Sequence, residues 1–465
     1  IPAVSTSTGA FAGEFRKGPL DEVVTISSEQ ELVNTFGKPD SSNFEDFFSA
    51  ANFLQYSNAL RVVRVQNSSV SNATESGSAF VIKNTTDYQD NYASGQASVG
   101  LWAARTAGAF GNSLQISTCP SATAYEEVNK TTVADAAMAV GDTVVTVTSA
   151  AGITAGDIVN FGDEYEYRVV SVATNDLNIV RKDEPAYFGT SESSGLHQAP
   201  TNGAQVRRRW KYYDLFDKAP GTSPYAQAKS GVNDELHIVV IDEDGDITGT
   251  KGDVLEKFEA VSKASDAKTA QGSVNYYPDV IYKASNYIYW MDHNAGGSNW
   301  GSAAAGTTFT DVTSVSNVSL QAGSDGTAAT IGQRKTAYEK FQDGETVDVG
   351  LIIAGAGDAT HIGNLITIAE NRKDAVVFAS PERADVVGVA DANTQKSNVV
   401  GFFNGIQSSS YVVFDSGYKY MYDRYNDVYR FVPLNGDTAG LCARTDNIAD
   451  SHFSPAGYNR GQIRG

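Results

Sequence analysis

In the first 66 residues, stretches in which every second position is hydrophobic take turns with stretches in which every third or fourth position is hydrophobic. The first pattern indicates strands and the second indicates helices. The runs "STGAFAGEFRKGP", "EVVTI" and "LRVVRV" are typical of strands, with a turn at Gly18-Pro19. The helix "EQELVNTFG" is expected to begin at Ser27, with Gln30 completing a capping box, and to end at Gly37. A second helix, "NFEDFFSAANFLQYS", places five apolar residues at helical spacing: Phe44, Phe47, Phe48, Ala51 and Leu54. This alternation predicts an α/β layer.

The same alternation returns in the last third of the chain. "VDVGLIIAGAG" and "AVVFASP" are apolar runs typical of buried strands, and "ATHIGNLITIAENRK" between them has a helical period. The apolar face of this helix contains Ile362, Leu365, Ile366 and Ala369. The pattern predicts a parallel βαβ unit. Because neither end of the chain alone can cover both faces of a sheet, we expect residues 1–66 and 325–465 to form one discontinuous α/β core domain.

The middle of the chain is predicted to be rich in strands. We expect residues 67–130 and 187–324 to form an inserted middle domain, and residues 131–186 to form a small outer barrel or sandwich of short alternating strands. A hairpin turn is expected at Asp244-Gly245. The expected fold class is a multidomain α+β or α/β protein, in which β-rich domains interrupt a discontinuous α/β core.

Tyrosines are concentrated near the C-terminal end, in "GYKYMYDRYNDVYRFVPLNGDTAGLCARTD". The segments "YVVFD", "YKYMYD" and "VYRFVP" are predicted to form an antiparallel meander, with Tyr418, Tyr420 and Tyr422 on one face. Asp437 is expected to cap the following helix. Three small residues would let that helix approach its neighbour closely: Ala439, Gly440 and Ala443.

Composition narrows the possible functions. The chain has 465 residues, enough for several cores, and 55 acidic against 35 basic residues give a formal charge of -20, which disfavours direct binding to nucleic acid. The two cysteines, Cys119 and Cys442, provide no disulfide framework and suit a reducing cytoplasm. No apolar run is long enough to span a bilayer, and the first residues do not have the pattern of a signal peptide, so membrane insertion is not expected.

Two glycine- and acid-rich turns are candidates for ligand binding. "GAG" at residues 355–357, between a strand and a helix, could hold a phosphate, but the third glycine of a dinucleotide fingerprint is missing and Asp358 adds negative charge. "DEDGD" at residues 242–246 departs from a calcium-binding loop, because Ile247 and Asp253 stand where glycine and glutamate are required. We expect a strand-to-helix turn and a hairpin turn at these places, with weak cation binding at 242–246 left open.

Histidines and a basic cluster complete the candidates. The five histidines are scattered without the spacing of metal ligands: His197, His237, His293, His361 and His452. No "GxSxG" motif presents a nucleophilic serine. "RRRW" at residues 207–210 could bind nucleic acid, but in an acidic chain it favours a face of salt bridges. We therefore expect no catalytic residue, no cofactor and no metal.

Several motifs of this sequence resemble one known family. They are "STGAFAGEFRKGP", "LVNTFGKP" and "SAANFLQYSNALRVVRV" near the start, and "KYMYDRYNDVYRFVPLNGDTAGLCARTDN" followed by "SPAGYNRGQI" near the end. This chain is similar in them to the tail sheath proteins of contractile-tailed bacteriophages, in particular those of T-even-type phages (myoviruses). The segment "AARTAGAFGNSLQI" resembles the family's strand entry, although Ala107 and Phe110 stand where proline and tryptophan are usual. The resemblance covers roughly half of the chain and does not include residues 131–186.

The resemblance assigns structural roles to twelve residues. They are Gly18, Pro19, Phe36, Gly37, Gly108, Gly111, Asn112, Gly440, Arg444, Asp446, Pro455 and Gly457. It also implies a virion structural protein that forms stacked hexameric rings around an inner tail tube and contracts to drive that tube through the host envelope, for ejection of the genome into the host cell. The implied partners are further copies of the chain, the inner tail tube protein, and the baseplate and tail terminator proteins. The implied location is the virion tail, assembled in the cytoplasm of the host bacterium.

Other hypotheses remain beside this one. The sequence begins at Ile1 and ends after "GQIRG", and against the family pattern it is expected to be shortened at both ends, without the C-terminal assembly domain, and to be monomeric. One alternative is a virion surface protein that binds carbohydrate or a receptor through residues 131–186. Another is an α/β hydrolase or nucleotide-binding enzyme with its site in residues 351–370.

Overall fold

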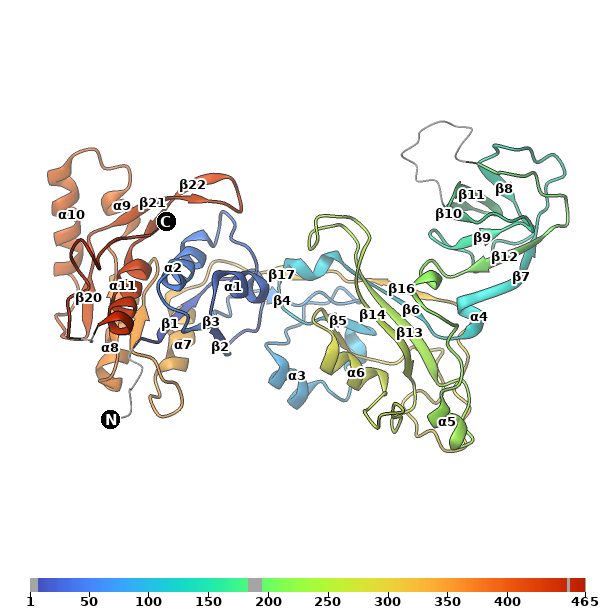
Figure 1. The fold of residues 1–465 in the computed structure, drawn as a ribbon, viewed down its shortest axis with the longest axis horizontal. Coiled ribbons are helices and arrows are strands. Elements are labelled where there is room, and N and C mark those ends of the chain that lie inside the picture. Colours follow the sequence, from blue (N-terminus) through green and yellow to red (C-terminus); the bar gives the residue numbers. More distant parts are fainter. Residues whose placement is uncertain (1–6, 183–194, 450–451, 465) are drawn as a thin grey trace. The chain divides into compact units, whose positions relative to one another are not determined.

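The computed structural model describes residues 7–182, 195–449 and 452–464. Within these residues the chain forms two compact units of mixed α/β structure with several sheets (Figure 1). The first unit contains residues up to 94, residues 104–112 and those from 321 onward, while the second contains residues 95–103 and 113–320. Each unit is described in turn.

A six-stranded sheet forms the centre of the first unit, in the order β2-β3-β1-β18-β19-β20. Its strands are β1 (Gly9–Gly13), β2 (Val23–Ile26), β3 (Leu60–Arg64), β18 (Leu351–Ile353), β19 (Val376–Ala379) and β20 (Val412–Phe414). Neighbouring strands run parallel except β2, which is antiparallel to β3. Because β1 pairs directly with β18, strands from the two ends of the chain share one sheet.

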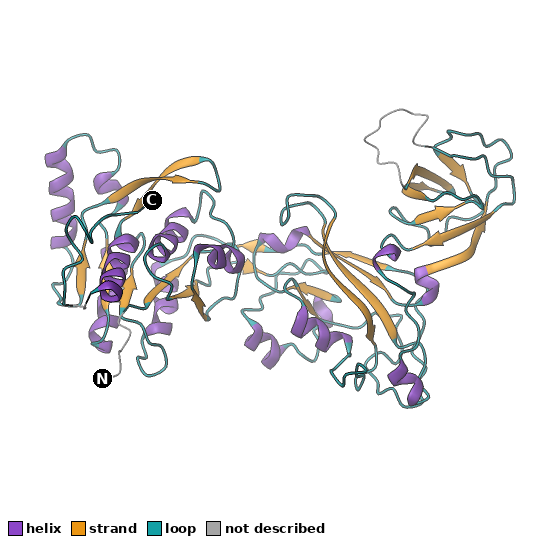
Figure 2. Cartoon of the chain, in the orientation of Figure 1, coloured by secondary structure: helices purple, strands orange, loops and turns teal. Residues whose placement is uncertain are grey.

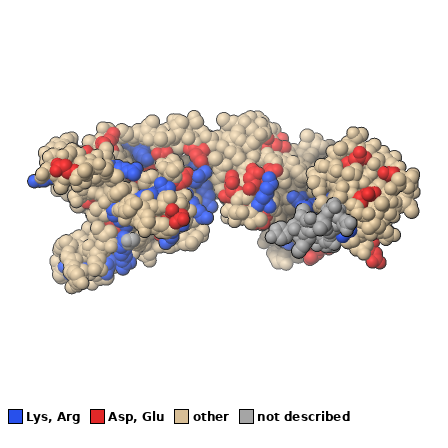
Figure 3. Space-filling view, turned by 90° about the horizontal axis from the view of Figure 1, so that it is seen from above, with Lys and Arg blue, Asp and Glu red and all other residues tan. Residues whose placement is uncertain are grey.

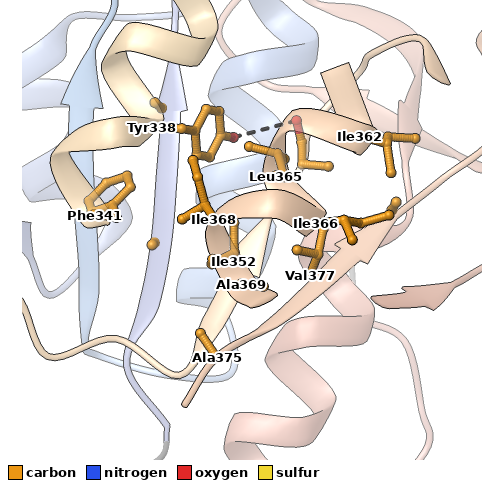
Figure 4. Packing of buried hydrophobic residues seen from close by; sticks show 14 of the residues in the cluster. Tyr338, Phe341, Ile352, Ile362, Leu365, Ile366, Ile368, Ala369, Ala375 and Val377 are labelled. Carbon is orange, nitrogen blue, oxygen red and sulfur yellow. Dashed lines mark hydrogen bonds between the residues drawn. The ribbon is translucent and has the colours of Figure 1, made fainter. Parts of the chain in front are cut away.

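Helices cover both faces of this sheet (Figure 2). On one face lie α7 (Ile331–Tyr338) and α8 (Ala359–Arg372), whose apolar side chains pack with Ile352 of β18 (Figure 4). On the other face lie α1 (Glu29–Phe36), α2 (Phe44–Leu54) and α11 (Asn435–Ile448), which pack with Ile353. Ile352 and Ile353 enter different clusters because successive side chains of a strand point to opposite faces. Burying each large apolar side chain contributes about 1.5–3 kcal/mol.

The predicted βαβ unit is confirmed as β18, α8 and β19, with the two strands parallel. All four residues predicted for the apolar face of α8 are buried. The carboxylate of Asp358 accepts a hydrogen bond from the N–H of His361 at 2.8 Å, which starts the helix, and Lys373 ends it in a left-handed conformation with φ 66°. The Tyr338 hydroxyl donates to the carbonyl of Ile353 at 2.6 Å and ties α7 to the sheet.

The predicted three-stranded meander is wrong in one strand. β21 (Tyr418–Asp423) and β22 (Val428–Pro433) form an antiparallel hairpin, but β20 pairs in parallel with β19 in the main sheet. The alternation of faces in β21 is as predicted, because Met421 is buried while Tyr420 and Tyr422 are exposed. The hairpin therefore covers the α2 side of the unit with Met421 and presents its tyrosines outward.

Two predicted helix caps are also wrong. Helix α1 is capped by Ser28, whose hydroxyl accepts from the N–H of Glu31, whereas Ser27 donates to the Glu31 carboxylate. Asp437 does not cap α11, because this helix begins two residues earlier and Leu434 occupies the capping position. The predicted end of α1 at Gly37 is confirmed, and its N–H donates to the carbonyl of Val33.

Short elements complete the first unit. They are β4 (Val70–Ser71), α3 (Thr85–Asn91), the 3₁₀ turn at Ala109–Ser113, β17 (Ser324–Asp325), the 3₁₀ turn at Glu339–Phe341, α9 (Arg383–Val386) and α10 (Ala392–Asn404). β4 and β17 pair antiparallel. Residues 67–94, which the sequence led us to expect in the middle domain, are part of this unit.

The second unit is built on an antiparallel sheet in the order β14-β13-β6-β16. Its strands are β6 (Leu114–Cys119), β13 (Glu235–Asp242), β14 (Asp253–Ser262) and β16 (Ser316–Ser319). Around it lie a pair of short strands and several short helices: β5 (Trp102–Ala104), β15 (Ile288–Trp290), the 3₁₀ turns at Ala97–Val99 and Tyr213–Leu215, α4 (Ala122–Tyr125), α5 (Pro224–Ala228) and α6 (Tyr277–Ala284).

A second sheet of this unit, in the order β7-β12-β9-β10-β11-β8, contains the region predicted to be a small barrel or sandwich. Its strands are β7 (Glu126–Thr132), β8 (Val144–Thr146), β9 (Ile158–Asn160), β10 (Tyr167–Ala173), β11 (Asp176–Arg181) and β12 (Gln205–Arg209). An antiparallel bridge between Val133 and Val147 joins the two ends of the sheet, which closes it into a barrel around buried apolar side chains. The sheet extends from residue 126 to 209, beyond the expected limits, and residues 183–186 of the expected range lie outside the described residues.

Among the described helices, none is long and apolar enough to cross a membrane.

Candidate functional site

The turn at Gly355 to Gly357 is filled by a side chain of the protein itself. The amide of Asn435 donates to the carbonyl of Gly355 at 2.8 Å and accepts from its N–H at 3.1 Å. Asp358 holds the N–H of His361 at the start of α8. Because these backbone groups are already paired, they are not available to a phosphate. The geometry supports a structural turn at this position.

The acidic segment at residues 242–246 is the start of the β13–β14 hairpin. Asp242 is fully buried, and its carboxylate accepts from the N–H groups of Gly245, Ile247 and Thr248 and from the hydroxyl of Ser113. These hydrogen bonds hold the pKa of Asp242 below its usual value despite burial, which acts in the opposite direction. The carboxylate therefore organises the loop between the strands, a longer loop than the tight turn that the sequence predicted.

The basic cluster on β12 is a set of ion pairs. Arg208 is buried and lies 3.3 Å from a carboxylate oxygen of Asp157, while Arg207 and Arg209 both pair with Glu126. Trp210 is buried and donates to the hydroxyl of Ser117 at 2.9 Å. These partners confirm the expected face of salt bridges. In Figure 3, which shows one face of the surface, basic side chains lie among acidic and uncharged ones.

The histidines do not converge on a common centre. His361 is buried with its Nε2 atom 3.0 Å from the carbonyl of Ala354, and Nε2 of His237 lies 2.9 Å from the carbonyl of Lys218. Burial lowers the pKa of both rings. Over residues 7–182, 195–449 and 452–464, no group of three or more His, Cys, Asp or Glu side chains is arranged to hold a metal ion.

Many of the residues singled out by the family resemblance gather around Arg64 in the first unit. This side chain is almost fully buried at the end of β3, and its guanidinium donates to the carbonyls of Gly18 at 2.9 Å and Ala107 at 2.7 Å. Burial lowers the pKa of Arg64 to about 10, and Asp325 partly offsets this effect. Arg64 thus joins the turn after β1 to the segment 104–112.

Gly108, Gly111 and Asn112 hold the segment 104–112 in place, the glycines by close packing and Asn112 by hydrogen bonds. At Gly108, with φ 138°, an added Cβ would lie 2.5 Å from the carbonyl oxygen of Arg16, and at Gly111 it would lie 2.7 Å from the Cβ of Ala104. The side-chain amide of Asn112 donates to the carbonyl of Gly323 at 2.9 Å and accepts from its N–H at 2.7 Å. No side chain larger than hydrogen fits at either glycine without moving these neighbours.

The turn after β1 also packs on the end of α1. Gly18 has φ 95°, and an added Cβ there would lie 2.7 Å from the ring of Phe36. Phe36 is fully buried and stacks on Phe15 with ring centroids 4.8 Å apart. Pro19 is half-buried and follows in extended backbone, and Gly37 ends α1 with φ 88°. All seven motif residues from Gly18 to Asn112 therefore belong to one locality around Arg64 and the end of α1.

Gly440 belongs to a different contact, between α11 and α2. An added Cβ at Gly440 would lie 2.5 Å from the ring of Tyr56, and at Gly436 it would lie 2.3 Å from the carbonyl oxygen of Ser49. The predicted close approach of this helix to a neighbour is confirmed, with Ala439 and Ala443 buried beside Gly440. The two helices touch nearly backbone to backbone at Gly436.

The remaining motif residues are not brought to either place. Arg444 and Asp446 are half-buried on α11, and Asp446 contributes with burial to raising the pKa of Cys442 to about 11. Pro455 is half-buried and Gly457 exposed in the segment 452–464, where Gly457 has φ 100° and accepts from the N–H of Gly461. These residues lie near the chain's end rather than around Arg64.

An exposed aromatic ladder lies on the outer face of the β21–β22 hairpin. Tyr420 pairs with Phe431 and Tyr422 with Tyr429 across the strands, with ring centroids 4.6 Å and 5.3 Å apart. Tyr420 and Tyr429 are 60% and 61% exposed. Exposed aromatic side chains in a contiguous group are typical of protein interaction surfaces.

Comparison with known proteins shows a similarity along nearly the whole chain. The profile described as the N-terminal region of domain III of the tail sheath protein Gp18 matches residues 6–65. The tail sheath protein of Salmonella phage ViI is 29% identical over 98% of this chain and 69% of its own length, and that of Enterobacteria phage T4 is 28% identical over 99% and 72%. Along nearly its whole length, this chain is similar to the tail sheath proteins of T4-type phages.

More distant relatives complete the comparison. The tail sheath protein of Vibrio phage KVP40 is 25% identical over all of this chain and 74% of its own length. Crystal structures of sheath tail proteins from Desulfitobacterium hafniense and Listeria innocua are each 10% identical, with TM-scores of 0.39 and 0.35. This chain covers 60% of the former and 78% of the latter. At these TM-scores individual elements cannot be compared.

The sequence did not single out Arg64, Asp325 or Asn435, although each holds part of the first unit together. Asp325 accepts from the N–H of Ala109 at 2.9 Å, and Asn435 pairs with Gly355. One signal was present for Arg64, because it follows the buried Val63 in an apolar strand where an arginine is unusual.

Proposed function

We propose that this chain is a structural subunit of a contractile phage tail sheath. The full-length sheath protein polymerises as stacked hexameric rings around the inner tail tube, and its contraction drives the tube through the host envelope. Its partners are further copies of the chain, the tube protein, and the baseplate and tail terminator proteins. It works in the virion tail after assembly in the host cytoplasm, and it carries no catalytic site.

The observation that carries this proposal is the alignment with sheath proteins along 98–100% of the chain. A similarity confined to one domain would leave the role of the other parts open, whereas this one includes both ends and the middle. The interior of the first unit agrees with a force-transmitting role. Its parallel sheet is covered on both faces, and α2 and α11 meet at Gly436 with little room to slide.

We also propose the domain division that a sheath of this kind requires. Segments from both ends of the chain form the discontinuous core, with residues 67–94 on the core side of the boundary; residues 113–125 and 210–320 form the inserted middle domain, and residues 126–209 the outer insertion. The pairing of β1 with β18 supports a core drawn from both ends of the chain. The closed barrel at residues 126–209 supports a separate insertion.

Antibody labelling of whole virions tests the proposal. Antibodies against the barrel, residues 126–209, are expected to decorate the tail at regular axial intervals in electron micrographs, and to do so at closer intervals on contracted tails. Antibodies pre-absorbed with the purified chain are the control and are expected to leave tails bare. Labelling restricted to capsids or fibres, or a spacing that does not change on contraction, would contradict the proposal.

A further inference from the structure

Three side chains from separate elements of the first unit form a buried polar cluster. Asp437 of α11 is fully buried, Tyr56 follows the end of α2, and Lys419 belongs to β21. One carboxylate oxygen of Asp437 accepts from the Tyr56 hydroxyl at 2.9 Å and from Lys419 Nζ at 3.0 Å. Burying a carboxylate costs free energy unless hydrogen bonds compensate for the lost water. The Tyr56 hydroxyl and the Lys419 ammonium group therefore both donate to Asp437, and the carboxylate fixes their orientation.

The cluster holds the main chain of Arg464. The N–H of Arg464 donates to the Tyr56 hydroxyl at 2.6 Å, and Lys419 Nζ donates to the carbonyl of Arg464 at 2.8 Å. Both backbone groups of one residue are therefore bound, as they are by a neighbouring strand in a sheet. This grip does not depend on the side chain of the bound residue.

The side chain of Arg464 makes contacts that favour arginine over other residues at this position. Its guanidinium donates to the carbonyl of Gln55 at 2.7 Å and lies 5.6 Å from the centre of the Tyr56 ring. Gln55 is the C-cap residue of α2, at the helix end where unpaired carbonyls and the helix dipole favour a positive charge. Stacking over the ring favours arginine over lysine.

The rest of the segment 452–464 is attached only weakly. Within its described residues, every hydrogen bond to other parts of the unit is made by Arg464, while Arg460 bonds to Ser454 inside the segment. Tyr458 is 88% exposed. The segment is thus a surface strap whose hold on the unit is concentrated at one residue.

We propose that Tyr56, Asp437 and Lys419 form a binding site for an arginine in an extended peptide segment, and that this site latches residues 452–464 onto the first unit. The latch opens without unfolding the unit, because Arg464 lies at the surface and the α2–α11 contact does not depend on it. This inference is independent of the proposed sheath function, since it concerns how the chain holds its own segment.

Trypsin cleavage after Arg460, followed by mass spectrometry, tests the latch. Cleavage needs the strap to leave the surface, so its rate follows the open population. Arg464→Ala removes the guanidinium contacts and is expected to raise the rate about tenfold, because a hydrogen bond to a charged group contributes about 1.5–3 kcal/mol. Lys419→Met removes the bond to the Arg464 carbonyl and is expected to raise it at least as much.

Controls separate the latch from general destabilisation. Lys396→Met, on the exposed helix α10, is expected to leave the cleavage rate unchanged. Arg464→Ala is also expected to leave the melting temperature of the unit unchanged, because the residue is exposed and outside the core. If Arg464→Ala alters the cleavage rate by less than twofold, the latch does not exist, whatever Lys419→Met does to the fold.

Discussion

Replacing Gly436 with alanine tests how closely α2 and α11 approach. The added Cβ would lie 2.3 Å from the carbonyl oxygen of Ser49 and 3.1 Å from its carbonyl carbon, whereas ordinary contacts begin near 3.4 Å. The obstacle is backbone, so the helices must separate by roughly 1 Å, and overpacking of this kind costs about 1–3 kcal/mol. Alanine's higher helix propensity returns at most about 1 kcal/mol. With the full gain in helix propensity, we expect a net loss of up to about 2 kcal/mol.

The matched control is Gly363→Ala on α8, where an added Cβ would meet no atom within 4 Å. This variant is expected to gain about 1 kcal/mol from helix propensity alone. A change of 1 kcal/mol shifts the melting temperature of a domain of this size by about 2–4 °C. The transition is therefore expected to fall by up to about 8 °C in Gly436→Ala and to rise by about 2–4 °C in Gly363→Ala.

The assay can follow the two units separately, because all four tryptophans belong to the second unit: Trp102, Trp210, Trp290 and Trp300. Circular dichroism reports both units, and tryptophan fluorescence reports the second. The fluorescence transition is expected to stay in place in both variants while the other transition moves. If Gly436→Ala melts at or above the temperature of the unaltered chain, the close helix contact inferred here is wrong.

Three further changes have defined outcomes. Arg64→Met leaves the carbonyls of Gly18 and Ala107 buried without a donor, so chemical denaturation should show a loss of about 2–4 kcal/mol in the free energy of unfolding. The control Arg61→Met, on the same strand, should change the free energy of unfolding by no more than about 0.5 kcal/mol. Equal losses in the two variants would contradict the role of Arg64. Burial raises the pKa of Asp415 to about 7, above an unfolded value near 3.9, so this group lowers the stability of the chain progressively as pH rises between these two values. In that range, the stability of Asp415→Asn relative to the unaltered chain should increase by about 1.4 kcal/mol per pH unit. A difference in stability that does not change with pH would refute the raised pKa. Millimolar calcium should leave the melting temperature unchanged, since backbone N–H groups already occupy the Asp242 carboxylate, and a calcium-dependent rise would restore a cation site there.

Local pattern was enough to predict the elements whose apolar period is long and regular. The faces of α8 and the parallel pairing around it followed from Ile362 and Leu365 at helical spacing between two apolar runs. The strand at Val412–Phe414 has the same period of two in a meander as in a parallel sheet, so its sequence could not show that its partner is β19. Pairing of strands is a long-range property that alternation does not encode.

The misplaced caps and the Arg64 locality have a common physical reason. Asp437 has the residue type of a helix cap, but its carboxylate binds Tyr56 and Lys419, which come from elements distant in sequence. Arg64 likewise binds carbonyls of Gly18 and Ala107, 46 and 43 residues away. Residue type shows that such a group needs a partner, and only the folded chain shows which partner it finds.

The barrel at residues 126–209 begins and ends at one point. Glu126 and Arg209 face each other across β7 and β12, so the chain enters and leaves this module through paired neighbouring strands. A module attached in this way can be exchanged for any other whose two ends lie side by side, with no change in the path of the polypeptide on either side. Recombination between phages can use this junction to trade one module for another, and the same junction offers a place to graft a foreign domain for display.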